Sequence, residues 1–135
     1  MAINSVTRGW AVRPRASTDN VNKSVGDKVN GTWVVKNQTG AARDARIVTV
    51  HLPAGASETL IGINTYLNVA NGGSQTLVMS QIDLAGFAPG TYGYKVTFED
   101  RAPAASTVTS GWGKIADRIF TVTVAGWSLG DLTVT

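Results

Sequence analysis

The clearest pattern in the chain is a strict alternation of apolar and polar residues over the segment Tyr92–Glu99. One face of an extended strand would carry Tyr92, Tyr94, Val96 and Phe98, and the other face would carry Gly93, Lys95, Thr97 and Glu99. A repeat of two residues is typical of a β-strand with one buried face. Pro89-Gly90, immediately upstream, favours a turn. The pattern therefore predicts a half-buried strand that follows a turn and has a tyrosine at its first inward position.

Short β-branched runs recur along the rest of the chain, and no segment shows a sustained helical repeat. The predicted strands are Thr7–Pro14, Lys28–Asn37, Arg46–Leu52, Thr59–Asn68, Ser74–Leu84, Thr91–Glu99, Arg118–Ala125 and Leu129–Val134. Turn-forming residues separate them, as in Asn37–Gly40, Pro53–Gly55 and Asn71–Gly73. Strands of this length at near-regular spacing predict an antiparallel sandwich or barrel. Arg101–Lys114 is the one long irregular segment, and we expect it to be a contact loop.

Several of these strand and turn sequences, taken in order, resemble those of prokaryotic and viral immunoglobulin-like modules. The resemblance is carried by Val25-Gly26-Asp27, Thr32–Gly40, Val69–Ser74, Leu84 and Pro89–Tyr92. The chain is similar to the bacterial cell-adhesion-related domain and to fibronectin type III-like domains. The similarity covers roughly residues 25–125 and consists of turn and core positions.

The resemblance implies an all-β fold, an immunoglobulin-like antiparallel β-sandwich of seven or eight strands. Residues 25–125 would form the sandwich, residues 1–24 an N-terminal arm or first strand, and residues 126–135 a C-terminal strand or arm. In such sandwiches a tyrosine near the start of strand F bonds its hydroxyl back to upstream backbone, and Tyr92 has that place. The families provide no universal catalytic residues.

Composition narrows the chemistry further. The 135 residues contain no cysteine, which excludes disulfides, thiol nucleophiles and thiolate metal sites. Neither a signal peptide nor an apolar run long enough to cross a bilayer is found, so we expect folding in the cytoplasm and no membrane partner. Residues 1–46 carry eight of the twelve Lys and Arg but three of the nine Asp and Glu. A basic first third fits an anionic partner or a complementary subunit surface.

The candidate catalytic residues lack the partners that catalysis needs. His51 is the only histidine, and its alternation with Val48, Val50 and Leu52 predicts a solvated face for it and for Thr49. Gly126–Gly130 matches the GxSxG pattern around Ser128, but too few residues follow for the helix that this motif requires. Glu99-Asp100 is expected to be a solvated strand end. We therefore expect no enzyme, no cofactor and no metal site.

Tryptophans are the main candidates for binding. Trp33 lies within a strong strand and is expected in the core. Three others follow a glycine, namely Trp10, Trp112 and Trp127. Trp10 and Trp127 lie in or beside strands and fit core or edge cover, whereas Trp112 lies in the irregular segment and fits partner contact. The partner-contact residues proposed from the sequence are Trp112, Trp10, Arg8, Arg13 and Arg15.

These features favour a non-catalytic structural or interaction module that assembles on a larger particle. A virion decoration, capsid or tail-associated protein, made in the host cytoplasm, is the concrete form of this expectation. Its expected partner is a protein or a particle surface. A second copy of the chain and a carbohydrate are the other partners considered. One alternative is a cell-surface or extracellular adhesion or carbohydrate-binding module. A second is an OB-type barrel that binds single-stranded nucleic acid, although nucleic acid is not the partner we expect.

Overall fold

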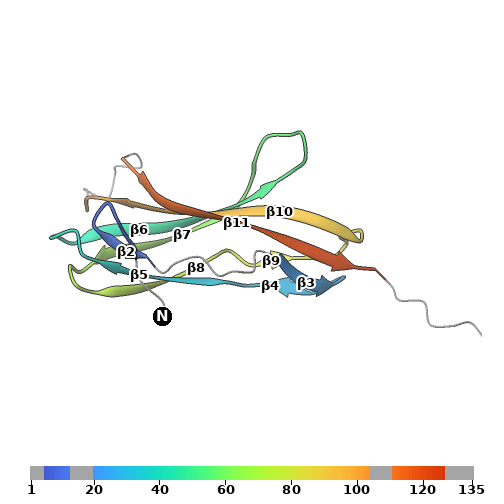
Figure 1. Ribbon diagram of the computed structural model, residues 1–135, viewed down its shortest axis with the longest axis horizontal. Helices are drawn as coiled ribbons and strands as arrows, with labels where there is room; N and C mark the ends of the chain where they lie inside the picture. Colours follow the sequence, from blue (N-terminus) through green and yellow to red (C-terminus); the bar gives the residue numbers. More distant parts are fainter. Residues whose placement is uncertain (1–4, 13–19, 104–110, 127–135) are drawn as a thin grey trace, which may run out of the picture.

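The computed structural model describes residues 5–12, 20–103 and 111–126, and all regular structure in these ranges is β-strand (Figure 1). The strands are β1 Ser5–Thr7, β2 Trp10–Val12, β3 Asn20–Ser24, β4 Lys28–Val29, β5 Thr32–Asn37, β6 Arg43–Leu52, β7 Thr59–Val69, β8 Ser74–Val78, β9 Ile82–Asp83, β10 Gly90–Arg101 and β11 Gly113–Ala125. The all-β class predicted from the alternating pattern is confirmed.

The strands form two main sheets that lie in two layers (Figure 1). One sheet has the order β1-β2-β5-β8, and the other has the order β3-β11-β10-β6-β7. A short pair, β4-β9, completes the arrangement. All neighbouring strands are antiparallel except β3, which runs parallel to β11. The described strands thus form open sheets with free edges, and not one closed barrel.

The N-terminal residues contribute to both sheets. The predicted strand Thr7–Pro14 is divided at Arg8-Gly9, where both residues have positive φ, so that β1 folds back on β2. β3 was not predicted, because its sequence Asn-Val-Asn-Lys-Ser carries a single apolar residue. Residues 1–24 were expected to be an arm or a first strand, and their described parts are strands. The expected strand Leu129–Val134 lies outside the described residues.

β10 confirms the strand that the alternation predicts. Tyr94, Val96 and Phe98 are buried, whereas Lys95, Thr97 and Glu99 are half exposed on the opposite face. The hydroxyl of Tyr92 donates a hydrogen bond of 2.6 Å to the carbonyl oxygen of Ala88. The expected bond from this tyrosine back to the turn is therefore present, and it ties the start of β10 to the Pro89-Gly90 turn.

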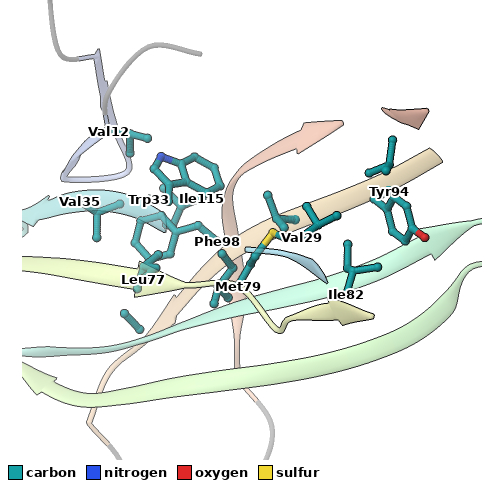
Figure 2. Packing of buried hydrophobic residues seen from close by; sticks show 14 of the residues in the cluster. Val12, Val29, Trp33, Val35, Leu77, Met79, Ile82, Tyr94, Phe98 and Ile115 are labelled. Carbon is teal, nitrogen blue, oxygen red and sulfur yellow. The ribbon is translucent and has the colours of Figure 1, made fainter. Parts of the chain in front are cut away.

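Side chains from both sheets meet in one core between the layers (Figure 2). Phe98 of β10 lies at its centre, edge-on to Trp10 with ring centroids 4.9 Å apart and to Trp33 with centroids 6.1 Å apart. Trp33 is 5% exposed, which confirms its expected place in the core. Met79, Leu77 and Ile115 fill the space around these rings (Figure 2).

Trp10 was expected as a partner contact, but the structure places it in the core. Its side chain is fully buried, and its Nε1 donates a 2.8 Å hydrogen bond to Oδ2 of Asp100. Because the indole lies between β2 and β10, no surface of the ring is left for a partner. Trp10 belongs to the core, which was the other interpretation of its strand position.

His51 and Thr49 do not lie on a solvated face as expected. Thr49 and His51 pair with Val96 and Tyr94, so they share the inward face of β10. Thr49 is fully buried, and the His51 ring lies 5.1 Å from that of Tyr94. Burial raises the pKa of the Tyr94 phenol, and the neighbouring Tyr92 raises it further. Val48 and Val50 instead face outward, beside Thr97 and Lys95. The expectation was wrong because β6 carries apolar residues on both faces, so the alternation alone could not show which face is buried.

Replacing Tyr92 with phenylalanine is expected to lower the free energy of unfolding by about 1 kcal/mol without changing the fold. The lost interaction is the 2.6 Å bond to Ala88, while the ring and its contact with Phe87 remain. Denaturant titration followed by circular dichroism measures the change. A midpoint equal to that of the unsubstituted protein would show that the bond contributes nothing to stability.

Replacing Trp10 with alanine is expected to cost about 3–5 kcal/mol, because it empties a fully buried position beside Phe98. Trp10→Phe keeps much of the ring volume but leaves Asp100 without its indole donor, so an intermediate loss is expected. Unfolding curves of the two variants separate packing from hydrogen bonding. Wild-type stability of Trp10→Ala would contradict the core placement.

Candidate functional site

The outward side of the five-stranded sheet, which we call the outer face, carries charged and apolar side chains arranged in rows. The strand register places Val50, Lys95 and Ile119 in one row across β6, β10 and β11. Val48, Thr97 and Asp117 form the next row, and Arg46, Glu99 and Lys114 form the third. From β7, Leu60 and Ile63 extend the first two rows. The face therefore changes from apolar to charged along the strands.

The charged side chains of the outer face are matched in pairs. Arg46 Nε lies 2.7 Å from Glu99 Oε1, Lys95 Nζ lies 2.5 Å from Glu58 Oε1, and Lys114 Nζ lies 3.2 Å from Asp117 Oδ2. Exposed pairs of this kind contribute little to stability. Their consequence is electrostatic, because the three cations and three anions leave this part of the face without net charge.

A shallow hollow of about 340 Å³ lies among these side chains. Its lining is Arg46, Val48, Val50, Glu58, Ile63, Lys95, Thr97, Glu99, Lys114 and Asp117. The valines and Ile63 provide an apolar lining, and the paired charges provide the rest.

Trp112 lies at the charged end of the outer face. The guanidinium carbon of Arg46 is 4.5 Å from the centroid of the indole ring, and that of Arg101 is 4.3 Å from it. Arg101 Nε also lies 3.2 Å from Oδ2 of the buried Asp44, while Arg46 is paired with Glu99. The ring is half exposed and lies outside the core cluster. Two anchored cations thus hold one accessible indole in a fixed place.

The arginines expected as partner contacts have different outcomes. Nη1 of Arg8 donates a 2.9 Å hydrogen bond to the carbonyl oxygen of Lys114. Its guanidinium also occupies the place where a Cβ at Gly113 would lie, so this exposed residue holds the start of β11. Arg13 and Arg15 lie outside the described residues, as do Trp127 and Ser128. Arg8 therefore contacts the two residues that follow Trp112 in the chain, whereas Trp10 lies in the core.

Asp100 is the important residue that sequence analysis misplaced. It was expected at a solvated strand end, but it is 2% exposed. Its Oδ2 accepts hydrogen bonds from Trp10 Nε1 at 2.8 Å and from Arg43 Nε at 2.9 Å. The signal in the sequence was the alternation itself, which continues through Phe98 and assigns Asp100 to the inward face.

Two further findings concern the described part of the chain. No group of three or more histidine and acidic side chains in it lies close enough to hold a metal ion. Within the same ranges, no helix is long and apolar enough to cross a membrane.

Comparison with known proteins identifies a similar fold. No protein-family model matches the sequence, and no curated protein matches it. A crystal structure of a β-glucosidase from Listeria innocua aligns with 89% of this chain at 15% identity and a TM-score of 0.53. A structure described as that enzyme in complex with gluconolactone aligns with 89% at 14% identity and a TM-score of 0.49. This chain spans 16% of the length of each, and the likeness concerns the fold alone.

Replacing Trp112 with alanine is expected to cost about 1–2 kcal/mol of stability, the sum of two partly exposed cation–π contacts. Thermal unfolding compared with Trp10→Ala tests this expectation, because the second variant loses a core ring. A loss as large as that of Trp10→Ala would mean that Trp112 belongs to the core and is not a surface residue.

Proposed function

We propose that this protein is a non-catalytic structural and interaction module that assembles on a larger particle. A virion decoration or tail-associated protein is the concrete form of the proposal. The observation that supports it best is Trp112, a partly exposed indole over which the guanidinium groups of Arg46 and Arg101 lie, at the charged end of a neutral, partly apolar sheet face.

Tryptophan and arginine are the residues that most often dominate the energy of protein–protein contacts. An indole that two guanidinium groups already hold in place loses little conformational freedom when a partner binds. On the same outer face, Ile63 and Ile119 are 43% and 50% exposed. The combination is that of an interface with an apolar centre and a charged rim.

The immunoglobulin-like form of the fold is part of the proposal. Two sheets that pack face to face support it, as does the bond from Tyr92 to the backbone four residues upstream. The alternatives have weaker support. An OB-type fold is a partly open barrel, whereas the described strands lie in separate sheets. A sugar stacks on an open indole face, and two guanidinium groups already lie over the Trp112 ring.

The test is to separate particles from soluble protein in a lysate of the producing cells on a density gradient. Mass spectrometry then locates the chain, and the same experiment is done with Trp112→Ala. We expect wild-type protein in the particle fraction and a variant that is folded but weakened in attachment by about 2 kcal/mol or more. Val34→Glu, on the outward side of β5, is the matched surface control and should remain attached.

A chain that sediments only as free protein would contradict the proposal. Retention on a polysaccharide column that Trp112→Ala abolishes would favour the carbohydrate-binding alternative. Salt-sensitive binding to a single-stranded oligonucleotide would favour the nucleic-acid alternative.

A further inference from the structure

Exposed apolar side chains are concentrated on one strand. Among the described residues, four of the eight exposed large hydrophobic side chains lie on β7, namely Leu60, Ile61, Ile63 and Leu67, which are 36–64% exposed. β7 is the last strand of its sheet, and no described strand pairs with its outer edge. At 11 residues it is long for an edge strand. The segment Thr59–Val69 contains no charged residue and no proline, the usual protections of an exposed edge.

The neighbouring edge, by contrast, is covered at its last residue. β8 ends the other sheet directly below β7, and two side chains of β7 reach its last residue. Asn64 Nδ2 donates to the carbonyl oxygen of Val78 at 2.6 Å, and the Val78 N–H donates to the Tyr66 hydroxyl at 2.8 Å. Both backbone groups of Val78 are therefore satisfied within the chain. The edge that remains open to another strand on this side is that of β7.

Two irregularities define the part of β7 that can pair. Thr49 and Val50 oppose Gly62 and Leu60, which leaves Ile61 as an extra residue. Ala45 and Arg43 oppose Tyr66 and Val69, which leaves Leu67 and Asn68 across from one residue. Gly62–Tyr66 is the regular run between them, and Asn64 is its midpoint.

Asn64 is the central residue of this run, so the run can pair antiparallel with a second copy of itself about this residue. We propose that the β7 edges of two copies of this chain pair antiparallel about a two-fold axis at Asn64, which joins two five-stranded sheets into one. Ile63 then faces Thr65 of the other copy. These two residues point outward, because Gly62, Asn64 and Tyr66 face inward toward β8 and Ser80.

The absence of charge on β7 favours a second copy of the chain as its partner. In a symmetric antiparallel pair, residues near the axis lie close to their own copies, so a charged strand would repel itself. β7 has no charge to repel a second copy of itself. This inference goes beyond the proposed function, since it requires no particle.

The test uses two double variants that differ only in the sign of one charge. In I63E/T65E each glutamate faces another glutamate across the axis, whereas in I63K/T65E each lysine faces a glutamate. Thr65 pairs with Arg46 within the chain, so the glutamate at 65 has a favourable neighbour in both. Val34→Glu, a 39% exposed position on the other sheet, is the control for a charge placed on an apolar surface site.

Sedimentation velocity over a range of concentrations gives the dimer Kd, and circular dichroism confirms that each variant is folded. Wild type and Val34→Glu should approach twice the 14.1 kDa mass of one chain. I63E/T65E should raise the dimer Kd about tenfold or more, and I63K/T65E should restore it to near the wild-type value. A wild-type protein that stays monomeric would overturn the proposal. An I63K/T65E variant that dimerises as weakly as I63E/T65E would overturn the axis at Asn64.

Discussion

The hydrogen bond from Trp10 to Asp100 is the interaction on which the arrangement of this protein depends. It joins residues 90 positions apart and connects the two sheets, β2 in one to β10 in the other. The chain has no disulfide that could do this, so a buried indole and a buried carboxylate hold the layers in register. Arg43 bonds the same carboxylate oxygen, which leaves the buried charge of Asp100 compensated by a cation on the adjacent strand.

The end of β10 that carries Asp100 on its inward face carries residues of the candidate site on its outward face. Because side chains alternate along β10, Asp100 faces the core while Glu99 and Arg101 face outward. Glu99 anchors Arg46 and Asp44 anchors Arg101, and these two guanidinium groups hold Trp112. The contact of Arg101 with Trp112 and the buried Trp10–Asp100 bond therefore lie on opposite faces of the end of β10.

The sequence predicted the parts of this arrangement in which one face of a strand is clearly apolar. β10 is such a strand, so its inward residues and the role of Tyr92 could be assigned. β6 reads Ile-Val-Thr-Val-His-Leu, apolar on both faces, and only its pairing with β10 places Thr49 and His51 inward. β3 is almost wholly polar and forms through its parallel pairing with β11, a contact 101 residues away that no local pattern encodes. Trp112 was assigned to the surface from its irregular surroundings, whereas its arginine partners come from strands distant in the sequence.

The alternation of side chains along β7 also explains why the neighbouring edges of β7 and β8 differ. On β7 the inward residues Asn64 and Tyr66 are polar at their tips, and they reach across to satisfy Val78 of β8. The outward residues Ile61, Ile63 and Leu67 are then left apolar and exposed. A chain whose polar side chains cover part of one edge while the other edge stays uncharged retains a surface that favours strand pairing. The cost of that exposure is removed if the free edge is covered in the assembled state, which is the arrangement that a symmetric pair of β7 strands provides.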